Sequence, residues 1–260
     1  MIEQLDIMAI APHPDDLEII CGGTLAKLVL QGYKVGIIDL TSGEPTPRGS
    51  EELRRQEAEA ARQILGVQLR LNLNLPNRIL MDTPENRFIV ATAIRRYRPA
   101  LIIAAAGRTP AASPDHHQGH LLIEASRFYS QLTKWDDRFE FTLPYRVPHL
   151  VYAPFPFDAE QRQWHSQFIV DISETFEQKL TSIRAYGSQF DSNRFDKVKH
   201  LITGNAISLG GRCGFMYGEL FALPHPVGTT DLLKLVKSNH SFSPHAEPII
   251  EPGKDHLPMN

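Results

Sequence analysis

Cysteine is scarce in this 260-residue sequence, which contains only Cys21 and Cys213. They have neither CxxC spacing nor the Cys/His spacing of a metal site, so we expect two reduced thiols. Also lacking is any apolar run near the roughly 20 residues that span a membrane. Residues 1–10 carry Glu3 and Asp6 but no basic residue, which argues against a secretion signal. These absences predict a cytoplasmic protein without a membrane partner.

A surplus of positive charge is lacking as well. Lysine and arginine number 27 against 30 aspartates and glutamates, a formal net charge of −3. Nucleic acids are bound by clustered positive charge, so we expect no nucleic-acid partner. What the chain does have is a hydrophobic content of 42%, enough for a sizeable core, and a length that suits one large α/β domain.

Strand-like and helix-like segments alternate along the first two thirds of the chain. Short apolar runs rich in strand formers predict strands over residues 6–11, 34–40, 68–75 and 100–106. The segments that follow them predict helices over residues 22–31, 50–65, 84–97 and 119–132. This alternation predicts a Rossmann-like α/β fold, a mostly parallel sheet with helices on both faces.

Some boundaries carry signals of their own, since Ser50 suits the N-cap of the second helix and Gly66 its end. Later patterns predict two strands, a helix and a short helix over residues 149–155, 168–172, 173–186 and 230–237. The composition then changes, because residues 224–260 contain six prolines. We therefore divide the chain into a domain of residues 1–223 and a Pro-rich C-terminal extension of residues 224–260.

The first motif that carries chemistry comes directly after the first strand and contains His13, Asp15 and Asp16. Open parallel sheets bind ligands beyond the carboxyl ends of their strands. Imidazole and carboxylate both suit zinc, so we expect His13 and Asp16 to reach one cation and to leave Asp15 free beside it. The alternative is that Asp15 or Asp16 simply caps the following helix.

The second motif, SPDHHQGH over residues 113–120, comes directly after the fourth strand. We expect one of its histidines to complete a site of two histidines and an aspartate. Three protein ligands with an open fourth position are typical of catalytic zinc. The alternative is the exposed start of a helix. Because both motifs follow parallel strands, we favour a shared metal site.

These motifs and the segments around them resemble a known family. AIAPHPDDLEIICGGTLAKLVLQGYKVGIIDLTSGE and the SPDHHQGH motif resemble the LmbE/PIG-L family of zinc-dependent N-acetylglucosamine deacetylases. FIVDISETFEQKLTSIRAYGSQF and GGRCGFMYGELF resemble its bacillithiol-pathway (BshB-like) branch, whose enzymes deacetylate N-acetylglucosaminyl malate. The resemblance covers roughly residues 5–222.

The resemblance implies roles for the residues of both motifs. It implies a Zn²⁺ ion, or another divalent metal such as Fe²⁺, held by His13, Asp16 and His116. It implies that Asp15 is the general base. It also implies that Asp115 orients a histidine and makes that histidine more basic.

The same resemblance implies roles for two arginines and an oligomeric state. Arg54 stands where the family has an arginine that reaches the substrate. Arg146 stands where the branch has an arginine near the reacting group or the neighbouring subunit. A surface salt bridge is the alternative for each. The resemblance also implies a homo-oligomer, often a hexamer.

The chain departs from the family pattern at two places. Ser113 stands where the family has a histidine that serves the leaving amine or the oxyanion, and serine cannot carry a proton at neutral pH. Residues 200–205 lack the tyrosine with which the branch polarises the acyl carbonyl. His117, His120 and His200 are the candidates to substitute, and surface histidines are the alternative.

These observations predict a zinc-dependent N-deacetylase that hydrolyses the N-acetyl group of an N-acetylglucosaminyl malate-like small molecule to acetate and a free amino-sugar. Two alternatives stay open: an amidase for another N-acyl conjugate, and a metal- or sugar-binding protein without turnover. For the extension, we predict an arm that packs across a neighbouring subunit, the alternative being that it wraps its own domain.

Overall fold

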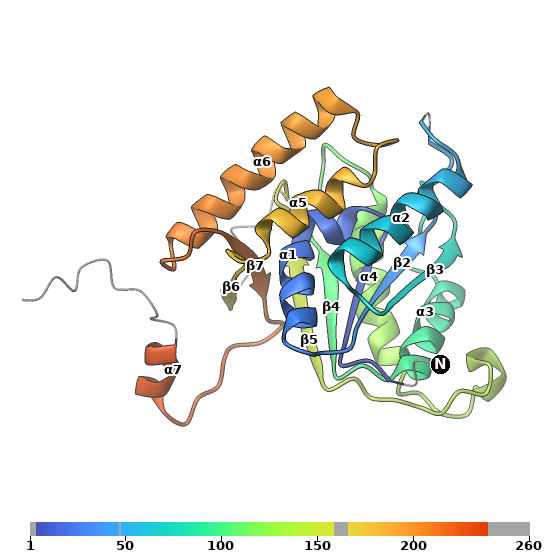
Figure 1. Cartoon of the computed structure of the whole chain (residues 1–260). Coiled ribbons are helices and arrows are strands. Elements are labelled where there is room, and N and C mark those ends of the chain that lie inside the picture. The colour runs from blue at the N-terminus through green and yellow to red at the C-terminus, as the bar shows by residue number, and fades with distance from the viewer. Residues whose placement is uncertain (1–3, 47, 159–165, 239–260) are drawn as a thin grey trace, which may run out of the picture.

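The computed structural model describes residues 4–46, 48–158 and 166–238. Its centre is a seven-stranded sheet of order β3-β2-β1-β4-β5-β7-β6 (Figure 1). The strands from β3 to β5 are parallel, whereas β7 runs antiparallel to both β5 and β6. The predicted α/β fold with a mostly parallel sheet is confirmed.

The strands are β1 (Ile7–Ala11), β2 (Val35–Thr41), β3 (Leu69–Leu75), β4 (Leu101–Ala106), β5 (His149–Pro154), β6 (Gln167–Asp171) and β7 (Gly218–Ala222). The helices are α1 (Asp16–Leu30), α2 (Glu51–Leu65), α3 (Pro84–Tyr97), α4 (Asp115–Tyr129), α5 (Phe176–Arg184), α6 (Ser192–Gly211) and α7 (Leu232–Ser238), with a 3₁₀ turn η1 (Asp136–Phe139). The helix predicted over residues 84–97 has these same bounds, and Ser50 and Gly66 cap α2 as expected.

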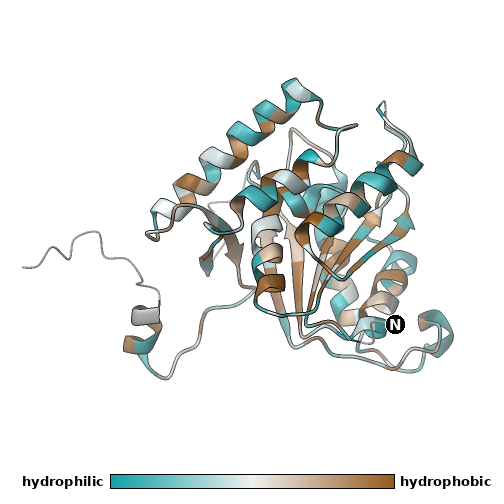
Figure 2. Ribbon diagram, viewed as in Figure 1, coloured by the Kyte–Doolittle hydropathy of each residue, from teal (hydrophilic) through white to brown (hydrophobic). Residues whose placement is uncertain are grey.

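Helices cover both faces of the sheet. α1, α2 and α5 pack together on one face, and α3 and α4 pack on the other. In β1, Met8 and Ile10 enter the core beneath α3 and α4, while Ile7 and Ala9 enter the core beneath α1. Figure 2 shows the resulting hydrophobic strands between helices whose outer faces are hydrophilic. A strand buried on both faces gives a continuous apolar run, which is why the central strands could be predicted.

Helix α1 begins earlier than predicted, at Asp16, and is kinked at Cys21, where φ is −144°. The turn after the kink is capped from β7, because Glu219 accepts the backbone N–H groups of Gly23 and Thr24 at 3.0 and 2.7 Å. Lys179 of α5 pairs with the same carboxylate at 2.5 Å. The predicted start at residue 22 corresponds to this turn after the kink, whereas the true start at Asp16 has no side-chain capping hydrogen bond to mark it.

Helix α4 also begins earlier than predicted. It starts at Asp115, not at Gly119, so Asp115 and His116 lie in its first turn. The predictions missed α6 and β7 altogether. α6 is mostly polar, and it buries only a narrow face, with Phe195 and Ile202 among the buried residues, against the β6–β7 end of the sheet.

The C-terminal extension leads away from the α/β body, and its helix α7 stands apart in Figure 1. Leu232 and Leu233 of α7 are 71% and 60% exposed. Val236 of the same helix is 43% exposed, and Leu235 is partly buried. Four more apolar residues of the predicted arm lie outside the described residues: Phe242, Ile249, Ile250 and Leu257. Among the described residues, no helix is long and apolar enough to cross a membrane.

Candidate functional site

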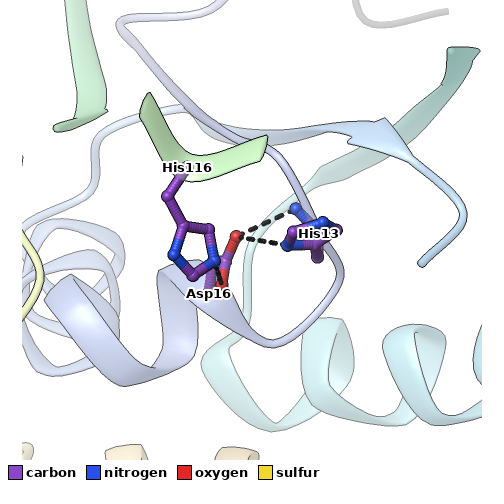
Figure 3. A group of neighbouring side chains, drawn as sticks. All are labelled: His13, Asp16 and His116. Carbon is purple, nitrogen blue, oxygen red and sulfur yellow. Dashed lines mark hydrogen bonds and ion pairs between the residues drawn. The ribbon is translucent and has the colours of Figure 1, made fainter. Parts of the chain in front are cut away.

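The two sequence motifs meet at the carboxyl end of the sheet. His13 and Asp16 follow β1, and His116 lies in the first turn of α4, which follows β4. β1 and β4 are parallel neighbours, so the residues after them share one edge. The three side chains converge (Figure 3), and one ligand atom from each lies within 4.8 Å of the others.

The Asp16 carboxylate lies between the two imidazoles. Its Oδ2 atom accepts the backbone N–H of His13 at 2.9 Å and lies 3.3 Å from His13 Nδ1. Its Oδ1 atom lies 3.4 Å from His116 Nε2. Asp16 and His116 are buried, so these polar groups need partners within the protein or an ion. Two imidazole nitrogens and one carboxylate oxygen are a donor set that suits zinc and similar divalent metals.

Two neighbouring residues orient the imidazoles. Asp115 Oδ2 lies 3.2 Å from His13 Nε2, and Thr109 Oγ1 lies 2.7 Å from His116 Nδ1. If these nitrogens carry the protons, His13 Nδ1 and His116 Nε2 keep their lone pairs toward Asp16, where a metal would bind. Thr109 has no motif around it, and sequence reasoning missed it.

The clustered charges shift the pKa values of these groups. Burial lowers the pKa of His13, but the adjacent Asp16 and Asp115 outweigh it and raise that pKa to about 10. Burial raises the pKa of Asp16, but His116 and His13 hold it well below its usual range. The metal-free cluster therefore gathers protons around an ionised Asp16, and a divalent cation would supply the same positive charge.

Asp15 is adjacent to the cluster without belonging to it. Its backbone adopts φ of 107°, a left-handed conformation rare for residues other than glycine. Its side chain makes no capping hydrogen bond to the described part of α1, so the capping alternative is wrong for Asp15. Instead Asp15 Oδ2 lies 3.3 Å from Arg54 Nη2, and Asp15 lines an opening of 240 Å³ together with His13, Arg54 and Ser113. Such strain is often kept at functional sites.

Arg54 of α2 is 4% exposed, and its Nη2 atom also donates to the Pro14 carbonyl at 2.7 Å. Its Nε and Nη1 atoms find no hydrogen-bond partner within the ranges that the structure describes. The guanidinium lies 5.4 Å from the ring centroid of Tyr186. Arg54 is therefore held at the opening through Pro14 and Asp15, while its two unpartnered donor atoms are buried.

Beneath Arg54 lies a buried charged network that the sequence did not reveal. Arg70 donates two hydrogen bonds to Asp39, at 2.7 and 2.9 Å, and one to Glu18, at 2.5 Å. The Tyr186 hydroxyl donates to the same Glu18 oxygen at 3.0 Å. These contacts fix the aromatic ring on which Arg54 rests. Their members are scattered along the chain, so no spacing could predict the network.

The structure does not bring Arg146 to the site of its own chain. Arg146 is exposed just before β5, whose amino end pairs with the amino end of β4. The candidate metal site lies beyond the carboxyl ends of β1 and β4, about 20 Å away for a strand of this length. A role for Arg146 at a neighbouring subunit's site stays a prediction.

The histidines considered as substitutes lie in different surroundings. His200 is exposed on α6, and His117 is exposed and lines a separate groove with Arg78 and Asp115. His120 lies 3.6 Å from Glu124, and its ring centroid is 5.3 Å from that of Tyr152. Ser113 itself lines the opening, and its hydroxyl oxygen accepts the backbone N–H of Asp115 at 3.2 Å.

Comparison with known proteins agrees with this site. The sequence model of the family PIG-L, described as GlcNAc-PI de-N-acetylase, matches residues 8–126, which contain both motifs. A diacetylchitobiose deacetylase of Thermococcus kodakarensis is 31% identical over 224 residues, which cover 82% of this chain and 80% of the relative. The chain belongs to the PIG-L family. It is thus a member of a metal-dependent family of N-deacetylases, enzymes that hydrolyse amide bonds.

Two further proteins are similar to this chain along most of its length. The crystal structure of the conserved protein TT1542 from Thermus thermophilus superposes with a TM-score of 0.74 at 34% identity, covering 87% of this chain and 97% of that one. A 4-oxalmesaconate hydratase of Pseudomonas putida is 24% identical over 72% of this chain and 74% of its own length. The PIG-L fold is therefore shared along most of the chain, including segments beyond residue 126.

Proposed function

We propose that this PIG-L protein uses zinc to hydrolyse the N-acetyl group of an N-acetylglucosamine-containing small molecule, of the N-acetylglucosaminyl malate type. The products are acetate and a free amino-sugar. The observation that carries the proposal is Asp15, a carboxylate beside the donor atoms of His13, Asp16 and His116 but separate from them. Metal binding alone does not need that carboxylate, whereas hydrolysis needs a base there.

His13, Asp16 and His116 would hold the zinc ion. When bound, zinc supplies a Lewis acid that polarises the acyl carbonyl and lowers the pKa of the attacking water. Asp115 and Thr109 keep the two imidazoles in the orientation that this requires.

Asp15 moves the protons. Burial raises its pKa to about 6 against the opposing effect of Arg54, so it is ionised at neutral pH and only slightly too acidic for an ideal base. Because Oδ2 faces Arg54, Oδ1 is the atom that accepts the proton of the attacking water. Ser113 cannot serve as an acid, so Asp15 then returns this proton to the leaving amine.

A second candidate function is the addition of water to a carbon–carbon double bond. Similarity to the 4-oxalmesaconate hydratase favours it, because a base beside a metal site serves either reaction. The absence of a histidine at position 113 does not count against hydration, in which no amine leaves.

Acetate release decides between these functions. The zinc-loaded protein should release acetate from N-acetylglucosaminyl malate, and D15N should lose this activity while it retains zinc. Activity only on other N-acyl groups would identify an amidase of different specificity. Hydration of an unsaturated dicarboxylate without acetate release would support the second candidate. Zinc binding with neither reaction would leave a binding protein.

A further inference from the structure

A groove of 640 Å³ runs beside the metal-binding cluster. Asp115, whose carboxylate contacts His13, lines the groove, and Arg78 lines both the groove and the opening above Asp15. A ligand whose amide reaches Asp15 therefore has this groove directly beside it. The volume suits a small-molecule fragment, because ligand pockets commonly measure about 300–1,000 Å³.

Arg78 projects from an anchored backbone. Its N–H donates to Asp115 Oδ2 at 2.6 Å, and its φ is 68°, a left-handed conformation. The residue is thus held in a sparsely populated conformation by the aspartate that also contacts His13. Strain that the surroundings maintain beside a cluster of metal-binding residues indicates a functional position.

The groove is positively charged although the chain is not. Arg78 and Arg108 are both exposed and line it, and neither guanidinium forms an ion pair with a described residue. The carboxylate of Asp115, also in the lining, is 1% exposed and already bonded. Asp82 nearby is neutralised by Arg87, which contacts both its oxygens at 2.6 Å. The backbone N–H of Arg108 donates to the Asp158 carboxylate at 2.9 Å. Two guanidinium groups that form no ion pair with a described residue fit an anionic ligand.

Apolar side chains share the groove with the arginines. Ile79 and Met81 are 72% and 52% exposed, and Pro110 lies with them in the lining. An exposed apolar patch beside convergent polar groups is typical of a ligand site.

Resting on the proposed function, we propose that Arg78 and Arg108 form a subsite for an anionic group, carboxylate or phosphate, carried by the substrate beyond its amino-sugar. The apolar wall contacts the short carbon segment that bears this group. The substrate class is then an acidic N-acetylglucosaminide, and these two arginines determine specificity.

The test compares N-acetylglucosaminyl malate with its dimethyl ester, which has the same shape without the charges, and with N-acetylglucosamine 1-phosphate. We expect kcat/KM to be at least 10-fold higher for the diacid than for the ester. R78M and R108M should each lower that ratio about 10- to 100-fold, through KM more than kcat, since charge-assisted hydrogen bonds contribute to this extent. R78K should retain part of the preference, and R212M, at an exposed arginine at the end of α6, is the matched control. A higher rate with the phosphate than with the diacid would assign the subsite to phosphate.

Binding separates this inference from the proposed function. The deacetylated product, glucosaminyl malate, and its dimethyl ester are titrated calorimetrically into zinc-loaded protein. Diacid binding at least 10-fold tighter, lost in R78M and R108M but not in R212M, supports the subsite even if no acetate is ever released. Equal affinity for diacid and ester, or loss in none of the variants, overturns the subsite even if the enzyme is an active deacetylase.

Discussion

Asp15 combines a left-handed backbone, a partly buried carboxylate and an arginine partner beside the candidate metal site. D15N retains the size and the left-handed tendency of the side chain but cannot accept a proton. We expect it to bind zinc normally and to lose about 10²–10⁴-fold in kcat, the usual contribution of a general base. Metal analysis and acetate release measure the two properties. D171N, at a distant carboxylate, is the control, and near-normal turnover of D15N would assign the base to another group.

Thr109 tests whether orientation of His116 matters. T109V keeps the shape of the side chain and removes the oxygen that lies 2.7 Å from His116 Nδ1. We expect zinc affinity to fall about 10- to 100-fold, as for other partners of metal-binding histidines. T109S, which keeps the hydroxyl, should stay close to the parent in a competition titration with a chelator. Equal affinities for T109V and T109S would show that the contact is dispensable.

The pKa of His13 predicts how pH affects metal binding. Its pKa of about 10 in the metal-free protein means that the imidazole is protonated at pH 7. Zinc must displace that proton, so binding should release at least one proton and tighten as pH rises, up to tenfold per unit for each proton. Calorimetry in buffers of different ionisation enthalpy measures the release. Identical heats in all buffers would mean that His13 is neutral before zinc binds.

Among these residues, the sequence predicted the members of the candidate metal site but not the side chains that orient and support them. His13, Asp16 and His116 belong to compact motifs after strands, and position after a strand is readable. Thr109, Arg70 and Tyr186 act through contacts that only the folded chain creates. Arg146 shows a different limit of sequence analysis. The resemblance suggested a role for it but could not say whether it acts at the site of its own subunit or at that of a neighbour.

Among the elements, the interiors of strands and helices were predictable, while several ends were not. α2 and α3 carry local caps, and their bounds agree with prediction to within one residue. α1 begins at Asp16 without a side-chain capping hydrogen bond, and the apolar face of α6 is too narrow to give a clear helical pattern. Boundaries could not be predicted where no local contact marks them.

The Glu219 cap gives a prediction about stability. Lys179 and Glu219 are 2% and 3% exposed, so E219Q would leave a buried ammonium unpaired. We expect a loss of about 3–5 kcal/mol in the free energy of unfolding. Urea denaturation measures it, and the double variant K179M/E219Q should recover part of the loss. If E219Q unfolds at the parent's midpoint, the pair does not support the kink.

For the whole molecule, the open question is assembly. We propose a homo-oligomer in which the C-terminal extension contacts a neighbouring subunit. Leu232, Leu233 and Val236 are exposed on α7, which stands apart from the body, and a second subunit would cover them. Deletion of residues 229–260 should then shift the protein to smaller species in analytical ultracentrifugation. If the sedimentation coefficient changes only as much as the lost mass requires, the extension packs on its own domain and does not hold subunits together.

The contact between Asp115 and residue 78 has an evolutionary consequence. The anchor is a backbone N–H, so any residue except proline that tolerates the left-handed φ of 68° can replace Arg78 without removing the contact to Asp115. The neighbouring groove positions 79, 81, 108 and 110 contribute no atom to the donor cluster either. Substitutions in the groove can therefore change which ligands it binds while His13, Asp16 and His116 stay in place. A family built this way can acquire new substrates by point mutation, before any change to its metal chemistry.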